Sequence, residues 1–217
     1  MNDTSDNVLY PPPPWRCSGS GLIVFRAIPA AQTQAPPHCA IQCILPGRTL
    51  GGYYIAQYYS PLAPGEPEVW HEWGNVACYA RYAKIRGLHI DAMAVDSPAA
   101  YKGGREIWGL NKTMGKIEIA VDGTRGEASL NLGENIIIMR WREFGFHFPF
   151  QRVLNYLTFI QDAVHAYSVV FRARCRLCRV EIVQQPTQEF SVLTPGSYFG
   201  LRFDGADVEI SSPRKIS

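Results

Sequence analysis

Residues 116–141, KIEIAVDGTRGEASLNLGENIIIMRW, contain three short segments in which apolar and polar residues tend to alternate. Asp122-Gly123 and Gly133 separate these segments, and such residues are typical of tight turns. Alternation with a period of two indicates a half-buried strand. This stretch therefore predicts three consecutive antiparallel strands joined by hairpins.

Much of the rest of the chain also consists of predicted strands. Further segments are short, rich in β-branched and aromatic residues, and mostly bounded by glycine or proline. They cover residues 22–28, 39–45, 52–59, 75–85, 89–95 and 168–183. We therefore expect a mainly β (α+β) fold, an antiparallel β-barrel or cone in which closure removes the sheet edges.

Few and short helices are expected. Ser97 before Pro98 supplies an N-cap and a first-turn proline, which predicts a helix from Pro98 toward Trp108 that the Gly103-Gly104 pair could break. Residues 151–167 form the second candidate. Their apolar residues at positions 153, 154, 157, 160 and 164 would form one stripe of a helix.

The chain is expected to form one domain. It has 217 residues, 47% of them hydrophobic, which is enough for one substantial core. PPPPW at residues 11–15 favours an extended, Pro-rich N-terminal arm over residues 1–15, followed by a single domain over residues 16–217. A polyproline ligand for another protein is the less favoured interpretation of this motif.

Charge and hydropathy exclude several classes of partner. The formal net charge is +2, from 21 basic and 19 acidic residues, so there is no signal for nucleic acid. The N-terminus is acidic and lacks an apolar run, so neither a secretory signal nor a transit sequence is predicted. The sequence contains no stretch of about 18 apolar residues, so no membrane span is predicted either. We expect a cytoplasmic protein that binds a small molecule and could assemble as a homo-oligomer.

The six cysteines do not predict a disulfide framework or a metal site. Cys175 and Cys178 are three residues apart in a predicted strand, so they should point to opposite faces. No companion His/Cys pair has zinc-ribbon spacing, and the histidines share no spacing typical of a metal site. We expect reduced, packed cysteines, no metal and no cofactor.

Three motifs resemble the acetoacetate decarboxylase superfamily. They are GRTLGGYYIAQYYS at residues 47–60, the acidic Glu72-Trp-Gly74, and DSPAAYKGGREIWGLNKTMGKI at residues 96–117. Members of that superfamily have a barrel or cone that houses a lysine, which forms a Schiff base with a keto substrate. The resemblance implies this fold, and lyase chemistry on a substrate with a carbonyl group.

The resemblance also assigns the central residues. It places Lys112 at the Schiff-base lysine, and Thr113 where the decarboxylase has a second lysine that helps to activate the first. Without the second cation, burial among Trp108, Leu110 and Met114 is expected to favour the neutral amine. Glu72 corresponds to an active-site carboxylate, which could relay protons during imine formation.

Other residues are candidates for binding the substrate or shaping the site. Arg105 and Glu106 match the family's G-R-E motif and are expected to form an ion pair, with each other or across strands, that shapes the loop and orients Lys112. Arg16 lies two residues before the position of an arginine that the decarboxylase uses. The remaining candidates are Gln57, Trp108 and Leu110.

Two functions remain open from the sequence. PPW before the first strand, GRTLGGYY at residues 47–54 and an arginine-rich strand near the C-terminus resemble the plant neoxanthin-deficient protein branch. One function is a Schiff-base lysine enzyme of secondary metabolism that acts on a keto acid or related ketone, as a decarboxylase or an aldolase- or dehydratase-type lyase. The other is a non-decarboxylating isomerase or binding factor for an apolar ligand such as a carotenoid or secondary metabolite.

Two further stretches bear on this choice. WREFGFHFPFQ at residues 141–151 is either part of the core or a wall or lid of an apolar pocket. Arg172, Arg174 and Arg176 alternate with apolar residues and share one strand face. We expect that face to meet solvent, since unpaired cations inside a barrel would be costly.

Overall fold

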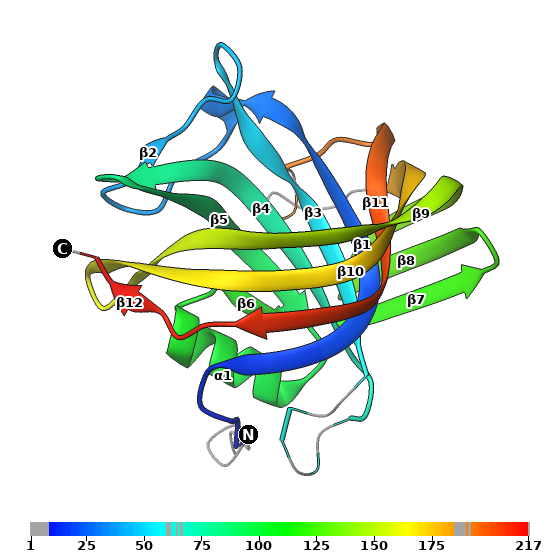
Figure 1. Ribbon diagram of the computed structural model, residues 1–217, viewed down its shortest axis with the longest axis horizontal. Helices are drawn as coiled ribbons and strands as arrows, with labels where there is room; N and C mark the ends of the chain where they lie inside the picture. Colours follow the sequence, from blue (N-terminus) through cyan, green and yellow to red (C-terminus); the bar gives the residue numbers. More distant parts are fainter. Residues whose placement is uncertain are drawn as a thin grey trace.

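The computed structural model describes residues 9–59, 62, 63, 65, 67–184, 190 and 192–216. Over these residues the chain forms one sheet of twelve strands, one α-helix and a 3-10 turn (Figure 1). The mainly β fold expected from the sequence is confirmed.

The elements follow one another in chain order from Trp15 to Lys215. They are β1 (Trp15–Pro29), η2 (Ala30–Gln32), β2 (Ala40–Ile41), β3 (Arg48–Tyr58), β4 (Trp70–Tyr82), β5 (Ile85–Val95), α1 (Pro98–Trp108), β6 (Lys112–Met114), β7 (Lys116–Asp122), β8 (Arg125–Leu132), β9 (Asn135–Ile160), β10 (Ala163–Gln184), β11 (Gly196–Ile210) and β12 (Arg214–Lys215).

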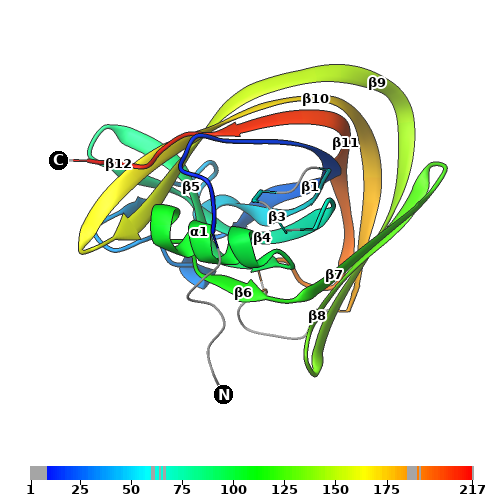
Figure 2. The ribbon, with the colours of Figure 1, turned by 90° about the horizontal axis from the view of Figure 1, so that it is seen from below.

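The strand pairings run around a ring. From β10 they pass through β11, β1, β3, β4, β5 and β9, and β9 pairs again with β10. Most of these pairings are antiparallel, but β5 meets β9 through a single parallel bridge between Leu88 and Tyr156. Figure 2 shows β9, β10 and β11 curving around the interior, with α1 lying across the end seen from below. This curvature creates an enclosed interior.

Residues 116–141 fold as predicted. Their three segments lie in β7, β8 and the start of β9, which pair antiparallel in order. Gly123 and Gly133 have φ angles of 57° and 77°, in the left-handed region that glycine adopts without a Cβ penalty. The turn residues therefore set the two hairpins.

The helix expected over residues 151–167 is wrong. These residues form the end of β9 and the start of β10, joined at Gln161 and Asp162, which both have positive φ. Apolar residues occur at helix-like spacing here because this part of the sheet packs on both faces. Leu154 contacts the cluster that fills the ring, whereas Leu157 is buried in a separate cluster. A strand with two apolar faces lacks clean alternation.

Two predicted strands also need correction. Only Ala40 and Ile41 of residues 39–45 are in a strand, β2, which pairs with β4. Residues 75–85 cross a turn, since β4 ends at Tyr82 and β5 begins at Ile85. Ala83, in that turn, has a φ of 50°. The sequence there carries no glycine or proline to mark the turn.

The core is divided between the two faces of the curved sheet. One cluster fills the ring and includes Cys175, Phe171 and Trp108. A second cluster packs outside the ring and includes Cys178 and Trp73. The two cysteines therefore face opposite sides, as the strand spacing predicted. Four cysteines are buried in all, namely Cys17, Cys78, Cys175 and Cys178.

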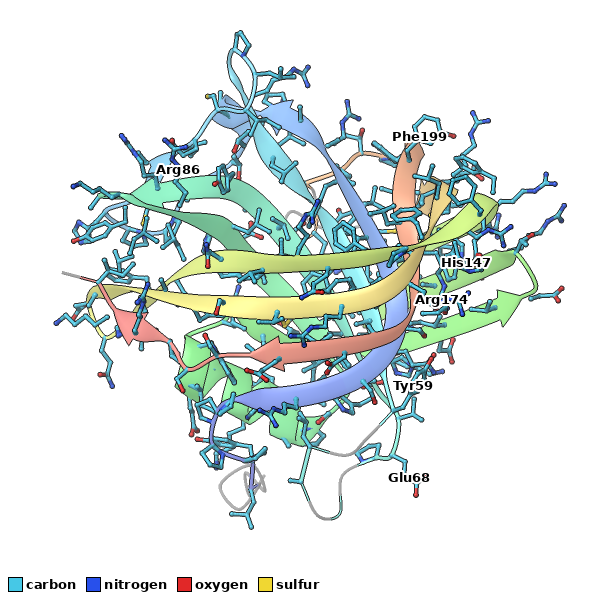
Figure 3. All side chains as sticks on the ribbon, in the orientation of Figure 1. Tyr59, Glu68, Arg86, His147, Arg174 and Phe199 are labelled. Atoms are coloured by element: carbon cyan, nitrogen blue, oxygen red, sulfur yellow. The ribbon has the colours of Figure 1, made fainter. Side chains whose placement is uncertain are left out.

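The outer surface carries the arginine-rich face of β10. Arg172 pairs with Asp207 and Arg176 with Glu143, while Arg174 points away from the ring (Figure 3). The expected outward direction of these arginines is therefore confirmed. Across the described ranges, no helix is both long and apolar enough to span a membrane.

Residues 141–151 are one continuous part of β9, not a lid. Trp141 is buried outside the ring, whereas Phe148 and Phe150 are partly buried against the cluster that fills it. Phe146, by contrast, is 82% exposed. The aromatic residues of this stretch are thus divided between core and surface.

Candidate active site

The ring encloses a cavity of about 90 Å³. Its walls are mostly aromatic and aliphatic side chains from the strands and from α1. Among them are Trp15, Tyr58, Trp70, Trp108, Phe171 and Phe203. Two charged residues also line it, Lys112 and Glu72. The cavity is therefore an apolar chamber that contains an amine and a carboxylate.

The end of α1 directs Lys112 into this cavity. Ser97 caps the start of the helix by accepting the Ala100 N–H at 3.0 Å, and the helix ends at Trp108, followed by the C-cap Gly109, whose φ is 61°. The chain then enters β6, where Lys112 pairs with Met93 of β5 in a parallel register. Lys112 is 4% exposed, so it is not an ordinary surface lysine.

Gly104 provides the space for the lysine. A Cβ at this position would lie 2.3 Å from Lys112 Cε and 2.8 Å from Nζ. Such distances are too short for real Cβ contacts, so the lysine side chain occupies the place of a missing side chain on α1. The Gly103-Gly104 pair does not break the helix, and Gly104 allows the close approach of Lys112.

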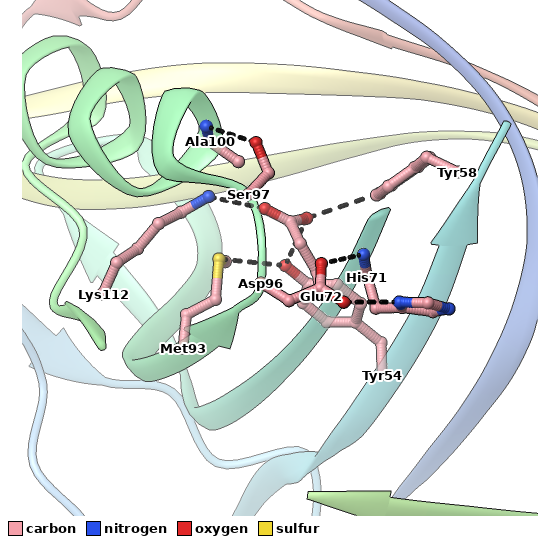
Figure 4. Close-up of polar contacts among 9 residues, drawn as sticks. All are labelled: Tyr54, Tyr58, His71, Glu72, Met93, Asp96, Ser97, Ala100 and Lys112. Carbon is pink, nitrogen blue, oxygen red and sulfur yellow. Dashed lines mark hydrogen bonds and ion pairs between the residues drawn. The ribbon is translucent and has the colours of Figure 1, made fainter. Parts of the chain in front are cut away.

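Glu72 is the partner of Lys112. It lies within β4 and is 5% exposed. Lys112 Nζ donates to Glu72 Oε1 at 2.5 Å, and the hydroxyls of Tyr54 and Tyr58 each donate to Oε2 at 3.4 Å (Figure 4). The carboxylate therefore accepts hydrogen bonds at both oxygens, and its charge is compensated by the ammonium group.

Four tyrosines surround this pair, namely Tyr54, Tyr58, Tyr156 and Tyr167. Burial raises the pKa of each phenol, and the charge of Glu72 raises each pKa further. These hydroxyls therefore stay protonated and can donate hydrogen bonds at neutral pH.

A thiol also lies close to the pair. Burial, with a smaller contribution from the charge of Glu72, raises the pKa of Cys17 to about 12, and Lys112 opposes the shift. Cys17 is therefore protonated at neutral pH, which disfavours it as a nucleophile.

Several residues predicted from the sequence meet in this cavity. Lys112, Glu72, Trp108 and Leu110 all line it. Tyr54 and Tyr58 were not among the residues predicted from the sequence. The alternation that places residues 54, 56 and 58 on one strand face could be read from the sequence, whereas the pairing of Ala56 with Glu72, which brings that face to the carboxylate, comes from the structure.

Arg105 and Glu106 do not form the expected ion pair. Both are exposed on α1: Arg105 donates to the hydroxyl of Tyr101, and Glu106 accepts from the hydroxyl of Tyr10. Neighbouring residues on a helix do not face each other, so each finds a partner elsewhere. Neither lines the cavity with Lys112.

Arg16 and Gln57 also lie outside the cavity, because of strand alternation. In β1, Trp15 and Cys17 are buried while Arg16 is exposed and pairs with Glu209 at 3.1 Å. In β3, Gln57 points to the face opposite its cavity-lining neighbours at positions 56 and 58. Their proposed roles at the substrate are therefore corrected.

Thr113 and Met114 do not surround the Lys112 amine. Both are exposed and line a shallow surface depression with Asp96 and Lys116. Because successive strand residues alternate, the residue after Lys112 points away from it. Burial of the amine comes instead from walls such as Trp108 and Leu110.

No metal centre is found in the part of the chain that the structure describes, where no three His, Cys, Asp or Glu side chains are grouped to hold an ion. His71 Nδ1 lies 2.6 Å from Asp96 Oδ2, but this pair is not among the residues that line the cavity. The chemistry available inside the cavity is that of an amine, a carboxylate and phenols.

No family model and no curated protein matches this chain. Solved structures do match it. Acetoacetate decarboxylase from Legionella pneumophila aligns with 100% of this chain and 94% of its own, at a TM-score of 0.65 and 16% identity. The enduracididine biosynthesis enzyme MppR, complexed with pyruvate, aligns with 99% of this chain and 95% of its own, at a TM-score of 0.65 and 17% identity.

A third structure is an acetoacetate decarboxylase-like enzyme from Sphingomonas wittichii RW1. It aligns with 93% of this chain and 92% of its own, at a TM-score of 0.63 and 10% identity. These likenesses show that the chain has the acetoacetate decarboxylase-like fold, as the sequence motifs implied.

Proposed function

We propose that this chain, with its acetoacetate decarboxylase-like fold, is a Schiff-base lysine enzyme of the lyase class that acts on a small carbonyl compound. Lys112 is the nucleophile and Glu72 its acid–base partner. The observation that carries the proposal is the 2.5 Å contact between a buried amine and a buried carboxylate in an apolar cavity. Apolar residues in the place of a buried ion pair often stabilise a protein as much as the pair does. The pair is therefore weak evidence of a stabilising role, and a chemical role explains it better.

The geometry supports imine formation by a short sequence of steps. Glu72 can take a proton from the Lys112 ammonium group, which leaves a neutral amine able to attack a carbonyl carbon. The amine then forms a C–N bond as the C=O π bond breaks, and the oxygen takes one proton from the nitrogen and one from Glu72 and leaves as water. Tyr54 and Tyr58 hold the second oxygen of Glu72 and so fix its orientation.

The resulting iminium draws electrons from the neighbouring carbon. It can therefore assist decarboxylation, retro-aldol cleavage or dehydration, depending on the group that the substrate carries. The walls of the cavity hold the reacting carbon near the amine and exclude bulk water.

The size of the cavity favours this function over the apolar-ligand alternative. The cavity measures about 90 Å³. Pockets for drug-sized ligands measure about 300–1,000 Å³. A carotenoid would have to displace many wall side chains, whereas a carbonyl compound of a few carbons would not. The pyruvate named in the MppR complex is a compound of this size class.

Reductive trapping tests the proposal. The protein is incubated with acetone, pyruvamide, pyruvate or acetoacetate in the presence of sodium cyanoborohydride, and the modified peptide is identified by mass spectrometry. We expect one adduct, on Lys112, that is lost in Lys112→Ala and kept in Lys116→Ala, which removes an exposed lysine. If none of the four compounds is trapped on Lys112, the proposed function is wrong.

A further inference from the structure

We infer that the substrate of this site is a neutral ketone or aldehyde without a carboxylate group, which leaves retro-aldol cleavage or dehydration, and not decarboxylation, as its reaction. The inference rests on the proposed function, in which Lys112 forms the imine. It names the class of compound that the cavity accepts, and it follows from the charges and hydrogen-bond donors that surround the amine.

The first observation is the charge inventory of the cavity. Among its described lining residues, only Lys112 and Glu72 are charged, and they contact each other at 2.5 Å. Glu72 accepts from Lys112, Tyr54 and Tyr58, which is the hydrogen-bonding pattern of an ionised carboxylate. The positive charge of the lysine is thus already matched before any substrate enters.

The arginines of the surrounding elements are directed elsewhere. Arg16, on β1, pairs with Glu209 outside the ring. Arg202 is buried on β11, but it donates to the backbone carbonyls of Gly21 and Phe203 and pairs with Asp204 at 2.9 Å. Neither guanidinium lines the cavity, so neither can form the two-pronged contact by which arginine binds a carboxylate.

The neutral donors are also largely engaged. The indole N–H of Trp15 donates to the Pro11 carbonyl at 2.8 Å, and that of Trp108 donates to the Ser211 carbonyl at 2.9 Å. Tyr156 and Tyr167, each with a hydroxyl, also line the cavity. A neutral hydroxyl donor suits the oxygen of a carbonyl or an alcohol, but it does not compensate a full negative charge.

The charge balance of the reaction separates the two substrate classes. With a neutral ketone, loss of water leaves a positive iminium opposite the negative Glu72, and the cavity stays neutral. With a keto acid, one further negative charge remains beside Glu72 throughout. A buried charge without a partner is strongly disfavoured, so the cavity is matched to the neutral compound.

A pair of probes with nearly the same shape tests this inference. Pyruvamide carries an amide where pyruvate carries a carboxylate, so the two differ mainly in charge. Their trapping rates on Lys112 are measured with cyanoborohydride near neutral pH and divided by the rates on Nα-acetyl-lysine, which corrects for intrinsic reactivity. We expect pyruvamide to be favoured at least about 100-fold, the order expected for an uncompensated buried charge.

Removing the negative charge should change this preference. In Glu72→Gln the lysine loses its counter-charge, so the ratio of pyruvamide to pyruvate trapping should fall at least about tenfold. Glu68→Gln is the matched control, because Glu68 is exposed and points away from the ring (Figure 3), and it should leave the ratio unchanged. The ratio is independent of how far the substitution slows trapping overall.

Each outcome decides the question. If wild-type Lys112 traps pyruvate as readily as pyruvamide, the inference is overturned while the proposed function stands. If Lys112 traps none of acetone, pyruvamide, pyruvate and acetoacetate, the proposed function fails and the inference fails with it. Should Glu72→Gln not fold, the wild-type ratio alone still decides between the two substrate classes.

Discussion

Replacing Gly104 by alanine tests the fit between α1 and the Lys112 side chain. The added Cβ would lie 2.3 Å from Lys112 Cε, whereas ordinary contacts begin near 3.4 Å. The lysine must therefore move by about 1 Å at Cε, away from the position in which its amine meets Glu72. A misplacement of about 1 Å can cost about 100-fold in rate, so we expect the trapping rate to fall by that order.

The same substitution should have a small effect on stability. Alanine in a helix interior is favoured over glycine by about 1 kcal/mol, which offsets part of the cost of moving the lysine. A net change of about 1 kcal/mol corresponds to about 2–4 °C in Tm for a chain of this size. Gly104→Ala should thus lose activity without losing the fold.

The assay combines cyanoborohydride trapping of pyruvamide with thermal unfolding. Gly103→Ala provides the contrast, since a Cβ there would lie 2.6 Å from the ring of Trp15 and not against the lysine. We expect this variant to lose more stability, and less trapping rate, than Gly104→Ala. A folded Gly104→Ala protein that is trapped on Lys112 at the wild-type rate would refute the placement of the lysine against α1.

Three further predictions follow from the positions of single side chains. At about pH 8 the exposed Cys43 should react with a disulfide reagent before the four buried cysteines, since burial raises the pKa of Cys17 to about 12; fast reaction of all six thiols in native protein would contradict this. Burial lowers the pKa of His89 below 6.5. As the pH falls below 6.5, the unfolded chain therefore takes up a proton at this residue more readily than the folded protein does, and the folded protein loses stability. His89→Gln should therefore make the loss of Tm on acidification less steep, and an unchanged slope would count against it. Thr113→Lys should shift the pH dependence of Lys112 trapping by less than about one unit, because residue 113 points away from the amine; a larger shift would show that the two side chains interact.

Local patterns in the sequence determined much of the fold. Turn residues such as Gly123 fixed the hairpins of β7, β8 and β9, and Ser97 with Pro98 fixed the start of α1. These features depend on contacts within a few residues, so they can be predicted from a short window. The resemblance in the motifs around Lys112 and Glu72 selected the two charged residues that the structure brings together.

The tertiary structure alone decided which face of each strand looks into the cavity. Strand alternation groups Tyr54 with Tyr58, and separates Arg16 from Trp15, but it does not say which group lies inside. The closing of the sheet into a ring made that choice, and it also turned residues 151–167 into two strands packed on both faces. Burial on both faces removes the alternation by which a strand is recognised, because the partners that bury it come from distant parts of the chain.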